Sequence, residues 1–238
     1  MATVTDSIAE NWSELFREQA LTTQDERLRV FYEQGTVAAD SPLSDVPFVA
    51  LDFETTGLDA GSDEIISIGL VPFDLNRIRL RDARHWLLKP RRAMKEESIV
   101  IHGITHTELS DAPDLNRILG QVLEAIAGRI VVVHYRYIER EFLDAALKRR
   151  LGEGIRFPVV DTMAQEAMLH RQGIGSLLKR LVGRKPESIR LSDSRNRYNL
   201  PHYGQHHALT DAIATAELLQ AQIHHRYSES TPISDIWI

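Results

Sequence analysis

Residues 49–59 read VALDFETTGLD, an apolar stretch interrupted by two carboxylates two positions apart. In a strand, successive side chains point to opposite faces, so Asp52 and Glu54 share one face and Phe53 takes the other. Neighbouring carboxylates repel each other and are costly to bury unless a cation neutralises them. The pattern therefore predicts a strand that presents a cation site. The plainer alternative is a strand end that emerges into solvent.

The segments around this strand predict an α/β domain. Strands are expected at 48–54, 64–74, 81–90, 129–134 and 156–162. Helices are expected at 111–128, 138–152, 163–170, 176–183 and 207–227, with a long polar loop at 184–205. The first three strands follow one another through short turns, which indicates an antiparallel meander. The later alternation of strand and helix predicts a mixed sheet, extended by parallel strands and covered by helices.

The two ends of the chain differ from this domain. Residues 6–34 carry apolar residues at helical spacing, and 35–47 have the glycine, prolines and small polar residues of a connector. We therefore expect an acidic helical N-terminal extension and linker at 1–46, a main domain at 47–226 and a tail at 227–238. The N-terminal helices could dock on the main domain or on a protein partner.

The composition narrows the kinds of site that the chain can form. It has no cysteine, so disulfides and thiolate metal sites are excluded, and a metal must use histidine and carboxylate. Such ligands favour Mg²⁺ or Mn²⁺ over structural zinc. No run approaches the ~18 apolar residues of a membrane span, and the first residues lack the pattern of a secretory signal. A cytoplasmic protein without a membrane partner is expected.

The charge is unevenly distributed. Residues 1–46 hold nine acids and three basic residues, which accounts for the whole net charge of −6. Elsewhere, 77–95 has eight basic residues against one acid, and 171–199 has eight against two. Basic stretches near clustered acids suit a polyanionic substrate brought to a metal site, although ordinary solvated faces would give the same counts.

A second group of polar residues lies in GQHHALTDA at 204–212. Asp211 falls inside a good helix, where aspartate has poor propensity and needs a reason. His207 is four residues earlier and would share its face, which suits a pair of ligands. His206 would approach from the preceding loop, which suits an acid or base. Spacing alone slightly favours His207, and either histidine could simply cap the helix.

A third group follows the strand in VVVHYRYIERE at 131–141. If a helix begins near Tyr137, Glu139 lies in its first turn, close to the strand end. Glu141 and Asp144 lie farther round or along the helix and are expected on the surface. Alternatively, Glu139 is simply a negative charge at the helix N-terminus, where it interacts favourably with the helix dipole.

In this order, DFETTG, VVVH with IEREFL, and HHALTDA resemble the three motifs of the DnaQ-like (DEDDh) 3′→5′ exonucleases, over about residues 48–223. The resemblance implies an RNase H-like fold and two divalent ions, Mg²⁺ or Mn²⁺, that assist cleavage of the 3′-terminal phosphodiester. It implies metal ligands at Asp52, Glu54 and Asp211, with His206 as the general base. The residues expected to bind substrate are Thr55, Thr56, Leu58 and His134. Asp161 matches a recurrent aspartate for which a structural role is at least as good an interpretation.

The chain departs from the family in the second motif. The family pattern places asparagine where this chain has Tyr135, and aspartate where it has Glu139. Glu139 keeps the charge but is one methylene longer, and we expect it to serve as the third acidic metal-site residue.

The leading interpretation is thus an exonuclease acting on single-stranded 3′ ends, with DNA favoured. An exoribonuclease that trims RNA, and a catalytically weakened domain that binds nucleic acid or a partner, are the alternatives.

Overall fold

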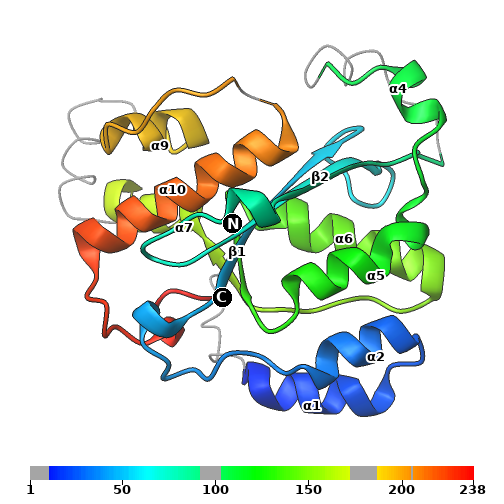
Figure 1. The fold of residues 1–238 in the computed structure, drawn as a ribbon, viewed down its shortest axis with the longest axis horizontal. Helices are drawn as coiled ribbons and strands as arrows, with labels where there is room; N and C mark the ends of the chain where they lie inside the picture. Colours follow the sequence, from blue (N-terminus) through cyan, green and yellow to red (C-terminus); the bar gives the residue numbers. More distant parts are fainter. Residues whose placement is uncertain (1–10, 92–102, 172–186, 205) are drawn as a thin grey trace.

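The computed structural model describes residues 11–91, 103–171, 187–204 and 206–238 (Figure 1). Its centre is a five-stranded sheet in the order β3-β2-β1-β4-β5. The strands are β1 (Phe48–Thr55), β2 (Ile65–Phe73), β3 (Arg84–Leu87), β4 (Ile130–Val133) and β5 (Val159–Asp161). β1, β2 and β3 pair antiparallel, and β4 and β5 extend the sheet in parallel from β1. The predicted mixed sheet is confirmed.

The described helices lie mostly where the sequence predicts them. They are α1 (Trp12–Thr22), α2 (Glu26–Glu33), α4 (His106–Ser110), α5 (Leu115–Ile126), α6 (Tyr137–Leu151), α7 (Thr162–Arg171), α9 (Leu191–Arg197) and α10 (Ala208–Arg226). Short 3-10 turns lie at Leu43–Asp45, Leu80–Asp82 and Ile233–Asp235. The Asp114 side chain accepts from the N–H of Asn116 and so begins α5. Gly152, at φ +78°, ends α6 in the left-handed conformation that favours glycine.

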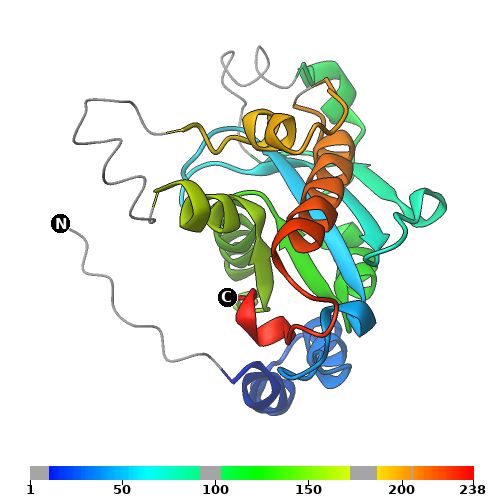
Figure 2. The same ribbon diagram turned by 90° about the vertical axis from the view of Figure 1, so that its left-hand side faces the viewer.

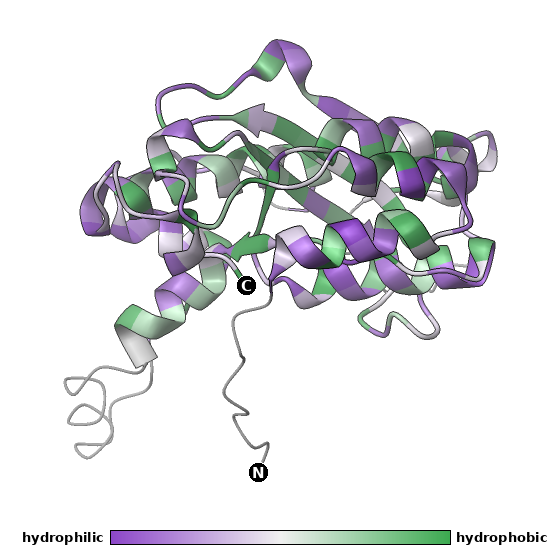
Figure 3. Cartoon of the chain, turned by 90° about the horizontal axis from the view of Figure 1, so that it is seen from below, coloured by the Kyte–Doolittle hydropathy of each residue, from purple (hydrophilic) through white to green (hydrophobic). Residues whose placement is uncertain are grey.

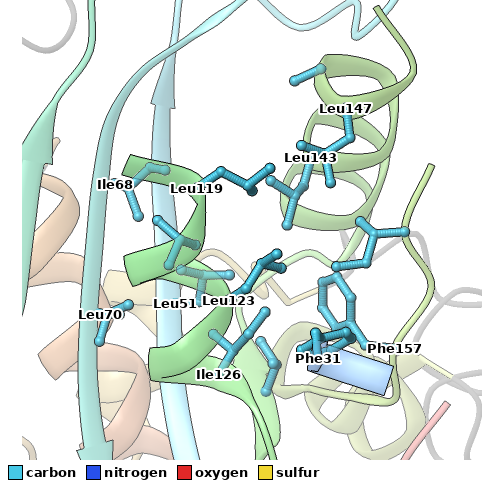
Figure 4. Packing of buried hydrophobic residues seen from close by; sticks show 14 of the residues in the cluster. Phe31, Leu51, Ile68, Leu70, Leu119, Leu123, Ile126, Leu143, Leu147 and Phe157 are labelled. Carbon is cyan, nitrogen blue, oxygen red and sulfur yellow. The ribbon is translucent and has the colours of Figure 1, made fainter. Parts of the chain in front are cut away.

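Helices cover both faces of the sheet (Figure 2), and a hydrophobic core lies on each face. Leu51 of β1 packs into the core that α5 and α6 cover, together with Leu119 and Leu143 (Figure 4). Truncating such a buried leucine to alanine costs about 2–5 kcal/mol. Ala50, one residue before Leu51, packs into the other core with residues of α10. The alternation places Asp52 and Glu54 on the face that α10 covers.

The close approach of α10 to the sheet depends on a glycine. A Cβ on Gly69 of β2 would overlap the backbone of Ala208 and Leu209. Gly69 is also the register partner of Asp52 on the neighbouring strand. The missing side chain therefore lets the beginning of α10 reach the sheet beside the acidic strand.

The N-terminal helices dock on the main domain. Trp12, Phe16 and Phe31 are buried in the same core as α5 and α6. The carboxylate of Glu153 accepts from the backbone N–H of Gln24 and Asp25 at 2.8 and 2.9 Å. Residues 11–34 therefore pack directly on the main domain.

The predicted linker and tail also pack together. Pro42 and Pro232 form an antiparallel bridge, and the neighbouring residues Leu43 and Ile233 are buried in the same core. The last residue, Ile238, exchanges backbone hydrogen bonds with Val159 of β5. The segments placed outside the boundaries at 46 and 226 thus contribute to the domain's second core.

One secondary-structure prediction is wrong, because the polar loop expected at 184–205 contains the helix α9. Its sequence has no apolar stripe, yet Ser194 and Arg195 are buried. The guanidinium of Arg195 donates to the Ala214 carbonyl and to Glu217 on α10, so tertiary contacts stabilise α9. The helix expected at 176–183 lies outside the described residues.

Polar residues cover the outward helix faces, and hydrophobic residues follow the strands (Figure 3). Among the described helices, none combines the length and hydropathy needed to cross a bilayer.

Candidate active site

The acidic strand β1 presents its two carboxylates toward α10. Asp52 is half-buried opposite Gly69, and Glu54 is buried opposite Ser67. The pairing register shifts directly after Glu54, where the chain leaves the strand for the following turn. The sequence prediction that both acids share one face is confirmed.

The beginning of α10 brings two further groups to this face. Glu54, His206 and Asp211 each offer a ligand atom, and these three atoms lie within 4.8 Å of one another. The backbone N–H of His206 donates to Asp211 Oδ2 at 2.9 Å. His206 holds a positive φ of 65°, a conformation that places it immediately before the helix with its backbone N–H directed at Asp211.

The two histidines of this segment have different environments. His207, not His206, caps α10: its Nδ1 accepts from the N–H of Thr210 at 3.4 Å. The His207 ring also lies 4.7 Å from the ring of His85. The structure therefore brings His206 to the acidic group and gives His207 the capping contact, against the slight preference from helical spacing.

Glu139 lies in the first turn of α6 and is only 2% exposed. Its Oε2 is buried and has no hydrogen-bond partner among the described residues. In contrast, Glu141 is exposed, and Asp144 accepts from the N–H of Ile155 and pairs with Lys148. Of the three acids that follow β4, Glu139 alone is both buried and short of a partner.

Burial and mutual proximity together shift the pKa values of these acids. Burial raises the pKa of Asp52 well above its ordinary value, and the charges of Glu139, Asp211 and Glu54 raise it further. Burial, with the charge of Asp211, raises the pKa of Glu54 to about 7. Burial likewise raises the pKa of Glu139 and of Asp211. Burial and neighbouring carboxylate charges that raise the pKa of Asp52 and Glu54 mark a site that a positive charge would stabilise.

The donor set fits divalent cations of the Mg²⁺ or Mn²⁺ type. Carboxylate oxygens are the preferred ligands of these hard cations, and thiolates are absent from the chain. The unpartnered Oε2 of Glu139 is a buried oxygen that needs a positive partner. Asp52, Glu54, Glu139 and Asp211 could therefore hold metal.

The turn after β1 uses its threonine hydroxyls internally. Thr55 Oγ1 donates to the Gly57 carbonyl at 2.6 Å, and Thr56 Oγ1 donates to Asp63 at 3.3 Å. A Cβ on Gly57 would overlap the Asp63 carboxylate, so glycine is required for this close approach. Leu58 is 86% exposed at the edge of the site. The predicted contacts of Thr55, Thr56 and Leu58 with a nucleotide remain predictions.

Both ring nitrogens of His134 have hydrogen-bond partners within the protein. Its Nδ1 lies 2.8 Å from Thr162 Oγ1, and its Nε2 lies 3.1 Å from the Ile189 carbonyl. Burial lowers the pKa of His134 to about 4, so the ring is neutral near pH 7. The side chain lines the cleft, but a direct hydrogen bond to substrate would need one of these two contacts to break.

Asp161 has the structural role weighed for it. Its carboxylate accepts from the N–H groups of Met163 and Ala164 at the beginning of α7. It also accepts from the N–H groups of Tyr135 and Arg136, just before α6. Asp161 thus fixes the chain that leads into Glu139.

A cleft of about 990 Å³ opens beside His206 and Asp211. One wall comes from α9 and the segment after it, which the sequence did not reveal. Arg195 Nη2 donates to the Pro201 carbonyl at 2.8 Å, and so ties this segment to α9. The only signal in the sequence was an arginine in a polar stretch, which does not distinguish a buried anchor from a surface residue.

The first basic stretch does not surround this cleft in the part that the structure describes. Arg77, Arg79 and Arg84 line a separate depression together with Arg129. From the second stretch, Arg190 lines the cleft itself. Among the described residues of the two stretches, those of the second therefore contribute basic side chains to the cleft.

Comparisons with known proteins agree with this geometry. A family model described as an exonuclease, RNase T, matches residues 49–219. The chain is 34% identical over 179 residues to the PolC-type DNA polymerase III of Thermotoga maritima, covering 75% of this chain and 12% of that protein. It is 31% identical over 185 residues to the DNA polymerase III subunit epsilon of Treponema pallidum, covering 78% and 80%. The chain thus spans only a small part of the PolC-type relative.

Solved structures share the fold. The nuclease domain of 3′hExo, a DEDDh family member bound to rAMP, aligns with a TM-score of 0.61 at 14% identity, over 76% of this chain and 92% of that one. Exonuclease X in complex with 5′-overhanging duplex DNA aligns with a TM-score of 0.58 at 20% identity, over 79% and 98%. The expected RNase H-like architecture is confirmed.

Proposed function

The chain belongs to the RNase T exonuclease family, in its DnaQ-like (DEDDh) group, and from this premise we propose that it is a metal-dependent 3′→5′ exonuclease. Its products would be nucleoside monophosphates released from single-stranded ends. The observation that carries the proposal is the convergence of Glu54, His206 and Asp211 within 4.8 Å, beside two further acids with raised pKa values.

Each residue has a role that follows from its position. Asp52, Glu54, Glu139 and Asp211 would hold the metal, because their oxygens are close and mutually repulsive. Two bound divalent cations would supply positive charge to the attacking and leaving oxygens of the phosphodiester. His206 would take a proton from the attacking water, and its exposed position before α10 suits a group that contacts solvent. Asp211 holds the backbone of His206 in place.

Single-stranded DNA is the favoured substrate. Two relatives that share 31–34% identity are named as DNA polymerase III proteins, which supports DNA over RNA. An exoribonuclease is the second candidate, because the structural neighbour 3′hExo is bound to rAMP. A weakened binding domain is less well supported, because four carboxylates and a histidine still converge. We further propose that the enzyme is cytoplasmic and that a protein partner binds to its N-terminal helices.

The test is incubation with 5′-labelled DNA and RNA oligonucleotides in Mg²⁺, Mn²⁺ or EDTA. The proposal predicts a ladder that shortens from the 3′ end, in metal only and faster on DNA. Faster trimming of RNA would favour the second candidate. Cleavage of circular single-stranded DNA, or a ladder in EDTA, would contradict the proposal.

A further inference from the structure

Tyr135 and Tyr203 line the cleft, and the ring of Tyr137 lies against that of Tyr135. The Tyr203 hydroxyl donates to Glu217 at 2.8 Å, and the Tyr137 hydroxyl accepts from Arg136 at 3.1 Å. Tyr135 is 43% exposed, and its hydroxyl makes no hydrogen bond within the described part of the chain. Its ring contacts that of Tyr137 at a centroid distance of 5.3 Å. Within this pair, only the Tyr137 hydroxyl is therefore hydrogen-bonded, whereas the partly exposed Tyr135 lines the cleft.

The backbone of Tyr135 is strained. Its φ is +91°, in the left-handed region that favours glycine and disfavours a bulky side chain. Asp161 holds this conformation, because it accepts from the N–H groups of Tyr135 and Arg136 at 3.1 Å each. It also pairs with the Arg136 guanidinium at 3.3 Å. Strain that is maintained by a buried carboxylate in this way is characteristic of functional sites.

The position of Tyr135 relates it to the acids. It follows β4 and lies two residues before α6 begins at Tyr137, so the contacts of Asp161 with the backbone of Tyr135 and Arg136 set its position relative to Glu139 in the first turn of α6. Tyr135 and Leu58 line the same cleft as His206 and Asp211. A strand whose terminal phosphodiester lies at the acids would place its bases along these exposed apolar surfaces.

We propose that Tyr135 is a substrate-binding residue that stacks on a base at or next to the 3′ terminus; this inference rests on the proposed exonuclease function. Every base has a π-face, so an aromatic ring binds single strands without choosing a sequence or a sugar. Tyr135 accordingly raises affinity for the strand and leaves the chemical step to the acids and His206.

Binding is tested in the full-length chain carrying His206→Ala, so that hydrolysis is slow, in Mg²⁺. The probes are single-stranded DNA oligonucleotides with 2-aminopurine at the 3′ terminus, at the next position or about ten nucleotides inward. Stacking on Tyr135 quenches the terminal or penultimate probe and leaves the internal one unchanged. Tyr135→Gly should remove the quenching and Tyr135→Phe should retain it. Quenching that persists in Tyr135→Gly would overturn the inference.

Kinetics and stability give a second, independent test in the otherwise unmodified chain. Tyr135→Gly should raise KM by about 5- to 100-fold, the range expected for losing one base–aromatic stack, and change kcat by no more than about threefold. Its Tm should equal or exceed that of the parent, because glycine relieves the backbone strain. Tyr135→Phe should restore KM. His224→Ala removes an exposed ring at the far end of α10 and should match the parent.

The outcomes separate this inference from the proposed function. An unmodified chain that produces the 3′-end ladder while Tyr135→Gly keeps the parental KM would overturn the stacking role alone. An unmodified chain that neither binds nor shortens the oligonucleotides would overturn both. A loss of kcat with unchanged KM would also contradict the stacking role.

Discussion

Two glutamates, Glu139 and Glu166, are almost completely buried in this protein, yet their surroundings are opposite. Glu166 accepts from Arg197, Tyr198 and Gln222, and these hydrogen bonds together with the Arg197 charge lower its pKa despite burial. Glu139 has an unpartnered oxygen and nearby carboxylates, and burial raises its pKa. The charge of Glu166 is thus compensated by groups of the chain itself, and that of Glu139 is not.

The difference indicates which buried acid belongs to the fold and which to a site. A buried charge is stable when hydrogen bonds and an opposite charge surround it, as they do for Glu166. Where the chain supplies more negative charge, as it does around Glu139 and Asp52, the compensation comes from protons at low pH and from a bound cation at higher pH. Substitutions at the two glutamates should therefore have opposite consequences for activity and stability.

The largest expected effect is the loss of hydrolysis in Glu139→Gln. The side chain keeps its size but loses the negative charge, so turnover should fall by about 10³-fold or more while the fold remains intact. Steady-state hydrolysis of a 5′-labelled oligonucleotide and a circular dichroism spectrum measure the two quantities.

Two variants on the same helix are the controls. Glu141→Gln changes an exposed acid and should alter turnover little. Glu139→Asp restores the family's aspartate and should retain partial activity or exceed the parent. Full activity in Glu139→Gln would show that the third acidic position lies elsewhere.

The next largest effect concerns the histidine that joins the acids. His206→Ala should lower turnover by about 10²–10⁴-fold, the scale for loss of a general base. Its affinity for Mn²⁺, measured by calorimetry, should be nearly intact. His207→Ala removes a cap and a ring contact and should be mild in turnover. A greater loss in His207→Ala than in His206→Ala would reverse the assignment.

Glu166→Gln should show the reverse pattern, with stability affected more than chemistry. The Arg197 guanidinium would lose its ionic partner. The amide would also be a weaker acceptor than the carboxylate for the hydrogen bonds from Tyr198 and Gln222. A loss of about 1–3 kcal/mol in the free energy of unfolding is expected from urea titration in EDTA. Glu139→Gln should show no such loss under the same conditions. Equal destabilisation by both variants would remove the distinction.

Much of the fold could be predicted because its signals are local. The alternation in VALDFE defines β1, and the Gly152 cap and apolar spacing define α6. α9 could not be predicted, because its stability comes from Arg195 contacts to Ala214 and Glu217 that lie far along the chain. The sequence of a polar helix that is stabilised by another helix of the same chain has the same pattern as that of a loop.

The acidic positions of the site were accessible for a similar reason. A strand fixes Asp52 and Glu54 on one face, and a helix start places Glu139. The histidines were not accessible to spacing, because His206 precedes α10 with a positive φ that no periodicity describes. The positions of Tyr135 and Arg195 in the cleft could not be predicted, because contacts between distant segments determine them. The hydrogen-bond partners of His134 could not be predicted for the same reason.

If the acidic group requires a cation, thermal unfolding across pH with and without Mn²⁺ will show it. The pKa of Glu54 is about 7 in the folded protein and near 4.5 when the chain is unfolded. The folded state therefore binds more protons between these values, and this contribution destabilises the metal-free protein as pH rises from about 4.5 to 7.

The measurement compares Tm in EDTA and in Mn²⁺ at pH 5 and pH 8, for the parent and for Glu54→Gln. In EDTA the parent should lose more Tm than Glu54→Gln between pH 5 and 8. Mn²⁺ should raise the parent's Tm by several degrees at pH 8 and by much less at pH 5, where protons occupy the carboxylates. An unchanged Tm on adding Mn²⁺ at pH 8, or an equal pH response in Glu54→Gln, would show that the acidic group does not depend on a cation.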